Sequence, residues 1–188
     1  MFANFNRFKK VINIVGKPSE KAVLTRQGKS SVSNFKSNFV YIALLEECSH
    51  LQKGDVFSTE IGGEMKVFLV ITVRKADMSL QAVVYECNGV AEVYRPRKIF
   101  DAADNLIETK LEFVDAIATN HMTVSGYMRM LDAGLLPSTT KEFRMPKCDI
   151  QLMDRIILDG EKFCVDFIDK TKFDGLLAVQ TSNDNRSF

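Results

Sequence analysis

The chain lacks the long apolar run and the excess of one charge that mark membrane proteins and nucleic-acid-binding proteins. No stretch approaches the roughly 18 to 20 apolar residues that a membrane span needs. The first residues lack the charged and then apolar order of a signal peptide. The 25 basic and 24 acidic residues give a net charge of +1, so no global field draws the protein to DNA or to an anionic membrane. We therefore expect a protein that stays in the cytoplasm where it is made, without membrane contact.

Motifs for metal, nucleotide and catalytic sites are missing as well. The four cysteines form no Cys-x-x-Cys pair, and none has a histidine at ligand spacing. No Gly-x-Gly-x-x-Gly, phosphate-loop or His-Glu-x-x-His pattern occurs. We expect reduced cysteines that pack as small apolar residues, and we expect His50 and His121 to lie at the surface beside loops. The sequence thus predicts no metal, no other cofactor and no catalytic residue.

What the chain does contain is an internal repeat. Residues 51–57 read Leu-Gln-Lys-Gly-Asp-Val-Phe and are followed by Gly-Gly-Glu and an apolar run; residues 150–156 read Ile-Gln-Leu-Met-Asp-Arg-Ile and are followed by Asp-Gly-Glu and another apolar run. A duplicated unit is typical of a scaffold that binds its neighbours. With two gaps of two residues each, one on either side of the Gly63–Gly160 pair, the copies align in eight pairs: Asp55 with Asp154, Gly63 with Gly160, Phe68 with Phe163, Val70 with Val165, Val73 with Ile168, Lys75 with Lys170, Val84 with Val179, and Asn88 with Asn183.

Each copy has the pattern of antiparallel β structure. Short apolar, β-branched runs alternate with turn-forming residues at a spacing that favours a small barrel or sandwich over a parallel sheet. Asp159 and Gly160 stand between two such runs and predict a two-residue hairpin turn, and Gly63 marks the matching turn in the first copy. Asp55 and Asp154 recur at equivalent positions, which indicates a structural role in capping a turn. The sequence therefore predicts a mainly β protein with two related small antiparallel β-barrel or meander units.

Two helices are expected beside these units. Residues 2–15 carry apolar side chains at helical spacing, and the Gly-Lys-Pro-Ser sequence at 16–19 ends the pattern. Residues 105–119 mix apolar and charged side chains in a way that suits a short linking helix, although their threonine and phenylalanine leave the pattern ambiguous. Residues 122–131 alternate apolar with small or basic residues and predict a strand.

These elements divide the chain into four expected segments. Residues 1–18 form an N-terminal helical arm, and residues 19–104 form the first β unit. Residues 105–140 form a linker with a helix and a strand, and residues 141–188 form the second β unit with a polar, loose C-terminal tail. Whether the two β units share one sheet stays open.

Six side chains are candidates for contacts with partners. The two near the N-terminus lie on the apolar face of the expected helix, which can reach a neighbouring subunit. The three cations lie at or within a long polar loop, residues 27–38, where they could touch phosphate, although a solvated loop explains them as well. The last residue could anchor the tail on a neighbour. These candidates are Phe5, Phe8, Arg26, Lys29, Lys36 and Phe188.

The second copy also carries an ordered set of short motifs. A proline enters a strand, an Asp-Arg pair and an Asp-Gly-Glu hairpin follow, and an Ile-Asp turn and a Gly-Leu-Leu strand close the unit. In this chain they are Met145-Pro146, Asp154-Arg155, Asp159-Gly160-Glu161, Ile168-Asp169 and Gly175-Leu176-Leu177. This order resembles the C-terminal β module of the small neck proteins of tailed bacteriophages, the head-completion and head-tail adaptor or joining proteins. The resemblance covers residues 145–163 and 168–177 well and the first copy more loosely.

The resemblance implies a structural protein of the virion neck. Such a protein is assembled in the host cytoplasm as a homo-oligomeric ring beneath the portal and around the DNA channel. Its implied partners are the portal and other neck or tail proteins, and a loop could contact the channel DNA without sequence specificity. A near-neutral chain with exposed strand edges is compatible with this, because strands can be added to neighbours and cyclic symmetry closes a ring.

Three alternatives stay open at this level. A tail terminator or baseplate component would also be a structural protein of the virion. A single-strand nucleic-acid-binding β-barrel would use exposed aromatic residues beside arginine and lysine, and Phe35, Phe39, Tyr85 and Tyr94 are its candidates. An enzyme would need reactive groups that converge in a deep pocket without leaving a sequence motif.

Overall fold

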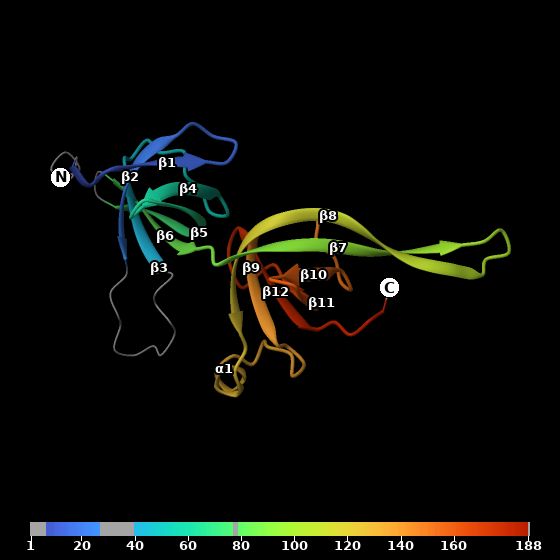
Figure 1. Cartoon of the computed structure of the whole chain (residues 1–188). Coiled ribbons are helices and arrows are strands. Elements are labelled where there is room, and N and C mark those ends of the chain that lie inside the picture. The colour runs from blue at the N-terminus through green and yellow to red at the C-terminus, as the bar shows by residue number, and fades with distance from the viewer. Residues whose placement is uncertain (1–6, 27–39, 77–78, 188) are drawn as a thin grey trace. The chain divides into compact units, whose positions relative to one another are not determined.

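The computed structural model describes residues 7–26, 40–76 and 79–187, which fold into two compact units (Figure 1). The first unit comprises residues up to 87 together with 173–176, and the second comprises residues 88–172 together with those from 177 on. Each unit contains a closed barrel of six antiparallel strands. The expectation of a mainly β protein with two antiparallel β-barrel units is confirmed.

The first barrel has the strand order β1-β2-β3-β6-β5-β4, and β4 pairs with β1 to close it. Alternation of buried and exposed side chains explains these strands; in β3, for example, every second residue is buried. The bounds are β1 Lys10–Ile14, β2 Glu20–Arg26, β3 Val40–Leu45, β4 Val56–Ile61, β5 Glu64–Ala76 and β6 Ser79–Glu86.

The second barrel repeats this topology with the strand order β7-β8-β9-β12-β11-β10, closed by pairing of β10 with β7. One short helix, α1, lies between β8 and β9. The bounds are β7 Gly89–Phe100, β8 Leu106–Thr123, α1 Gly126–Leu131, β9 Lys141–Pro146, β10 Arg155–Leu158, β11 Glu161–Asp169 and β12 Leu176–Asn183. The duplication therefore includes all six strands of each barrel, whereas the sequence repeat covers only the last three.

The repeated turn before β4 and β10 is the same structure twice. In the first copy, the Asp55 carboxylate accepts a hydrogen bond from the backbone N–H of Gln52 at 2.7 Å, and in the second copy the Asp154 carboxylate accepts one from Gln151 at 2.8 Å. The residue before each aspartate has a left-handed backbone, with φ of 84° at Gly54 and 69° at Met153. Asp55 and Asp154 thus lie where a turn-capping residue is needed.

The hairpins that follow have turns of equal length but strands of different length. Gly62 and Gly63 join β4 to β5, and Asp159 and Gly160 join β10 to β11; all four residues have positive φ. Two successive positive φ values are the geometry of the tight turn that joins twisted antiparallel strands. The first hairpin has six cross-strand pairs and the second has four, so the first contains four extra residues, two in each strand.

The last strand of the repeat corrects the alignment. Val70 pairs with Val84 in the first barrel, but Val165 pairs with Thr181 in the second, so Thr181 rather than Val179 is the counterpart of Val84. The stretch from Val165 to Thr181 is two residues longer than the stretch from Val70 to Val84. Because side chains alternate with a period of two, this shift keeps the same face buried and leaves the apolar pattern unchanged.

Both expected helices are wrong over the described residues. Within 2–15, residues 10–14 form β1, in which Ile12 and Ile14 are buried and Val11 and Val15 are exposed. This alternation and the β-branched side chains favour a strand. Residues 106–123 form β8 instead of the linking helix, and the strand expected at 122–131 is helical from Gly126 to Leu131.

The expected segment boundaries also change. Residues 89–123, which were divided between the first β unit and a linker, form the first two strands of the second barrel. The loose tail is wrong as far as residue 186, because Asp184 is buried and bonded to Arg155 of β10. Residue 188 lies outside the described residues.

Each barrel encloses its own apolar core. In the first, Phe57 and Phe68 stack with ring centroids 5.2 Å apart, and Tyr41 meets Phe68 edge-on. In the second, Phe143 and Phe163 pack edge-on at 5.8 Å. The two barrels have separate sets of buried residues, which answers the question whether they form one sheet: each closes by itself.

Replacing Gly160 by alanine tests the turn chemistry. With φ of 82°, Gly160 adopts a backbone that disfavours any Cβ, although no other atom lies within 4 Å of the added carbon. We expect a loss of about 1 to 2 kcal/mol in the free energy of unfolding, measured by urea denaturation. Gly126→Ala is the control, because Gly126 has open space and no positive φ. Equal stability of Gly160→Ala and the wild type would contradict this.

Candidate interaction surface

The candidate interaction surface is the outer part of the β7–β8 hairpin. β7 pairs with β10 through residues 92–94, and β8 pairs with β9 through residues 120–123. Farther out, residues 94–100 and 106–113 continue as a two-stranded ribbon that extends beyond the barrel (Figure 1). We call these residues and the loop between them the ribbon. A two-stranded hairpin is marginally stable in water by itself, so the ribbon would be stabilised by a partner.

The tip of the ribbon is a defined turn. The Asp101 carboxylate accepts hydrogen bonds from the backbone N–H groups of Ala103 and Asn105, both at 2.8 Å, and from the side-chain amide of Asn105 at 3.0 Å. The bonds from Asn105, and then that from Ala103, hold the pKa of Asp101 below its ordinary value. Asp104 completes the turn with φ of 60°. The strands are therefore held in register at their far end.

The base of the ribbon is fixed by Arg95. Its guanidinium donates two hydrogen bonds to the Asp154 carboxylate, each at 3.0 Å, and two to Asp149, at 3.1 Å to the carboxylate and 2.8 Å to the carbonyl. The bonds to Asp154, and then those to Asp149, raise the pKa of Arg95 above its ordinary value. The repeated aspartate that caps the turn before β10 thus also anchors the ribbon.

One face of the ribbon is apolar. Residues that pair across an antiparallel ladder share a face, and Tyr94 pairs with Phe113 and Pro96 with Leu111. The Tyr94 and Phe113 rings meet edge-on at 5.6 Å, yet Phe113 remains 59% exposed. After the Lys98–Thr109 pair and a β-bulge, Phe100 pairs with Leu106, and both are more than half exposed. We call these residues the apolar face: Tyr94, Pro96, Phe100, Leu106, Leu111 and Phe113.

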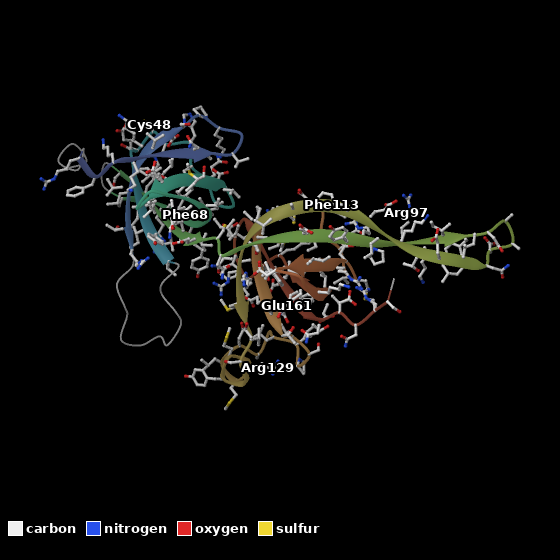
Figure 2. The ribbon with its side chains drawn as sticks, viewed as in Figure 1. Cys48, Phe68, Arg97, Phe113, Arg129 and Glu161 are labelled. Carbon is white, nitrogen blue, oxygen red and sulfur yellow. The ribbon has the colours of Figure 1, made fainter. Side chains whose placement is uncertain are left out.

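The opposite face of the ribbon is charged and largely paired. Arg97 donates to Glu112 at 2.7 Å, and Lys110 lies 2.8 Å from Glu108 (Arg97 and Phe113 are labelled in Figure 2). The ribbon is therefore amphipathic, although no core of its own unit covers the apolar side. Contiguous exposed apolar surface rimmed by charge marks a site of protein contact.

A second exposed apolar patch lies on α1. Ser125 caps this helix by accepting from the Met128 N–H at 3.2 Å, and no residue of the helix is buried. Tyr127, Met130 and Leu131 are 60%, 85% and 58% exposed. In strand order, the β8–β9 connection that carries α1 corresponds to the β2–β3 connection of the first barrel, which lies outside the described residues.

The structure describes two of the six side chains proposed for partner contacts. Phe8 is 52% exposed, and the guanidinium of Arg7 lies 4.8 Å from its ring centroid. Arg26 donates to the Tyr41 hydroxyl at 3.1 Å and lies over the Tyr41 ring. Neither residue lies on the ribbon. The other four, Phe5, Lys29, Lys36 and Phe188, lie outside the described residues, as do Phe35 and Phe39.

A polar groove of about 610 Å³ on the second barrel has its own charge pairs. Lys141 donates to Glu161 at 2.7 Å and lies 4.6 Å from the Phe163 ring centroid. The Lys141 hydrogen bond and charge hold the pKa of Glu161 below its ordinary value. Lys141 and Glu161 neutralise each other, and Lys162 and Asp184 carry opposite charges. The groove therefore offers little net charge to a ligand. It is lined by Thr123, Thr140, Lys141, Gly160, Glu161, Lys162, Phe163, Asn183, Asp184 and Asn185.

A smaller groove of about 400 Å³ lies on the first barrel. Its lining includes Glu20, Cys48, Ser49 and His50. The Glu20 carboxylate accepts from the Ser49 hydroxyl, from the His50 backbone N–H at 2.7 Å, and lies 2.9 Å from His50 Nδ1. Burial works to raise the pKa of Glu20, but these bonds outweigh it and the pKa is lowered. Ser49 donates to Glu20 and not to the imidazole, so these bonds hold the loop at Ser49 and His50 against the first residue of β2.

Three of the four cysteines are partly or fully buried, and His121 packs beside an aromatic ring. All four cysteines are free; Cys48 is exposed, and burial raises the pKa of the Cys87 thiol to about 12 and that of Cys148 to about 11. His121 is not a loop-edge residue, because it lies in β8 with its ring 5.8 Å from that of Phe143. Burial and the charge of Lys141 lower the pKa of His121.

Within residues 7–26, 40–76 and 79–187, no three His, Cys, Asp or Glu side chains are grouped so that they could hold a metal ion. In that same part of the chain, no helix has the length and apolar character to cross a membrane.

Sequence reasoning missed the ribbon, although its sequence contains a signal. Glu108, Lys110 and Glu112 alternate with Thr109, Leu111 and Phe113, which is the period of an amphipathic strand. The same stretch also places apolar residues at helical spacing, and the helical pattern was preferred. Comparison with known proteins found no match: no family model matches the chain, and no curated protein matches it.

Proposed function

We propose that this protein is a non-enzymatic structural component of a tailed-bacteriophage neck, in which copies assemble as a ring between portal and tail. The amphipathic ribbon is the observation that carries the proposal, because an exposed apolar face on a marginal two-stranded hairpin is suited to a neighbouring subunit. The resemblance of the second barrel to the β module of neck proteins supports the same reading.

A ring needs heterologous contacts, in which two different surfaces of one subunit meet the two neighbours. The second unit offers two such surfaces on different elements, the apolar face of the ribbon and the apolar side of α1. A tail terminator or baseplate component would use the same surfaces, and only the identity of the bound partner distinguishes it from a neck protein.

Single-strand nucleic-acid binding is the competing function, because Tyr94 and Phe113 are aromatic and cations lie nearby. Such sites combine stacking rings with cations along one groove. Here Arg97 and Lys110 lie on the face opposite the rings, and Arg97 is paired with Glu112, which leaves Lys98 as the one ribbon cation on the face of the rings. The arrangement therefore favours a protein partner over a nucleic acid.

Binding to the portal protein of the same virus tests the proposed function. We expect the purified chain to form oligomers and to bind portal or neck complexes in sedimentation experiments. Phe113→Ser should weaken this binding about tenfold or more, because exposed aromatic residues that become buried in an interface contribute most of its binding energy. Arg97→Ser, on the charged face of the same ribbon, is the matched control and should bind nearly as the wild type does.

Two results would contradict the proposal. One is a strict monomer that binds neither portal nor tail complexes at any concentration tested. The other is salt-dependent binding of single-stranded DNA that Phe113→Ser abolishes, which would favour the nucleic-acid-binding alternative.

A further inference from the structure

The two outer edges of the ribbon differ in their backbone groups. In an antiparallel ladder, a hydrogen-bonded pair exchanges two N–H···O bonds, and such pairs alternate with pairs that make none. Proline has no N–H, so the Pro96–Leu111 pair is one that makes none. The N–H and C=O of Leu111 therefore point away from β7, and by alternation those of Thr109 and Phe113 do as well.

The edge of β7 is protected against strand addition. The same alternation turns the backbone of Tyr94, Pro96 and Lys98 outward, and Pro96 removes the central donor from that row. Arg97 and Lys98 add two cations beside it. Proline and lysine on an edge strand are features that discourage pairing with another chain.

The edge of β8 is less protected: Lys110 is its one cation between Leu106 and Phe113, and a β-bulge lies at its outer end. Between Leu106 and Phe113 it has no proline, and each outward-facing residue offers both a donor and an acceptor. Its charges alternate as Glu108, Lys110 and Glu112, so they complement an antiparallel strand of the same sequence. Both barrels are closed, and this edge lies in the part of β8 that extends beyond the second barrel.

We propose that β8 of one copy pairs antiparallel with β8 of a second copy about a two-fold axis at Leu111. A contact that uses the same edge of both partners is necessarily two-fold. With Leu111 opposite Leu111 of the second copy, the two N–H groups and two carbonyls on the axis pair with each other. Lys110 then faces Glu112 of the second copy, and the reverse pair forms on the other side of the axis.

This register also matches the faces of the two ribbons. Thr109 lies opposite Phe113 of the second copy, so the apolar faces of both ribbons lie on one side of a four-stranded sheet. Sheets of three or more strands are more stable than an isolated hairpin. The pairing would thus stabilise the ribbon and double the apolar face that a larger partner meets. It goes beyond the proposed ring, because a two-fold contact closes on itself and propagates no ring.

Cysteine cross-linking tests the contact and its register in the full chain, with the exposed Cys48 replaced by serine. In the proposed register, positions 110 and 112 of different copies lie opposite each other. A mixture of the Lys110→Cys and Glu112→Cys proteins should therefore form a disulfide-linked heterodimer under mild oxidation, while each protein alone forms little. Lys98→Cys on the protected edge is the control and should cross-link with neither.

Charge reversal gives an independent measurement by sedimentation equilibrium. Lys110→Glu makes three successive charges of β8 acidic and should weaken the dimer about tenfold or more, since it replaces two attractive cross-strand pairs with repulsive ones. Lys98→Glu changes the net charge equally on the other edge and should leave the dimer unchanged.

Three outcomes would overturn the inference. They are a monomer at all concentrations, cross-linking of Lys110→Cys or Glu112→Cys alone in preference to the mixture, and equal effects of the two charge reversals. Loss of the β8 contact would leave portal binding intact, so its failure is distinct from failure of the proposed function.

Discussion

Replacing Asp184 by asparagine is expected to lower the free energy of unfolding by about 3 to 5 kcal/mol, because it removes a carboxylate charge that pairs with the buried Arg155 guanidinium. The Asp184 carboxylate accepts from Arg155 Nε at 2.7 Å and from Arg186 Nη2 at 2.8 Å. The side chains of Asp184 and Arg155 are only 1% and 3% exposed. This ion pair ties the end of the chain to β10 inside the second unit.

The same pair predicts a dependence on pH. Burial works to raise the pKa of Asp184, but hydrogen bonds from Arg186 and Arg155 outweigh it and hold that pKa well below its ordinary value. A lowered pKa in the folded state means that the stabilisation is present above the pKa of the unfolded chain and is lost as the pH falls. Urea midpoints of wild type and Asp184→Asn should therefore converge as the pH falls below about 4.

Arg186→Gln is the matched control for this prediction. It removes the other cation at Asp184, but the Arg186 side chain is 26% exposed, so about 1 kcal/mol or less should be lost. If Asp184→Asn and Arg186→Gln were equally stable, or if the difference between wild type and Asp184→Asn did not change with pH, the buried pair would not be the source of the stability.

The sequence was sufficient to predict the parts of the fold that depend on local turns. The left-handed turn before β4 and β10 and the Asp159–Gly160 hairpin follow from residues that tolerate or favour positive φ. These are requirements of a few adjacent residues, and both copies retain them. The corresponding strands, β4 to β6 and β10 to β12, were visible as a repeat for that reason.

Strands β1 and β8 were not predictable in the same way. The segment 106–123 has apolar residues at both strand and helix spacing, and only its pairing with β7 selects the strand. That pairing is set by contacts distant along the chain, which outweigh local preference. In β1, the alternation of Ile12 and Ile14 with Val11 and Asn13 was overlooked because a phenylalanine-rich segment precedes it.

The interaction surface shows the same limit. The candidates Phe5, Phe8 and Phe188 were chosen because chain ends and loops often contact partners. The ribbon lies instead inside an element that was divided between two predicted segments. A surface made by two strands can be recognised only when their register is known, because the register decides that Tyr94 and Phe113 share a face.

The residue that anchors the ribbon also could not be recognised from the sequence. Each repeated aspartate receives a cation from the first hairpin of its own barrel: Lys17 bonds Asp55 at 2.7 Å, and Arg95 bonds Asp154. Lys17 follows the short strand β1, whereas Arg95 lies within the long strand β7. The two cations are therefore not aligned in sequence, and their equivalence is visible only in the barrels.

Asp154→Asn and Asp55→Asn compare these two anchors directly. Asp154 is 1% exposed and accepts two hydrogen bonds from one guanidinium, so loss of its charge should cost about 2 to 3 kcal/mol. Asp55 is 17% exposed and its Lys17 partner is 25% exposed, so about 1 kcal/mol should be lost there. Urea unfolding of both variants measures the difference.

Hydrogen exchange then shows where each change acts. Because Arg95 holds the base of the ribbon, Asp154→Asn should speed amide exchange along residues 95–113 as well as in β10. Asp55→Asn should leave the exchange of the ribbon unchanged. If both variants lost equal stability, or if the ribbon amides exchanged at wild-type rates in Asp154→Asn, the Arg95–Asp154 pair would stabilise only its turn and the ribbon would need another anchor.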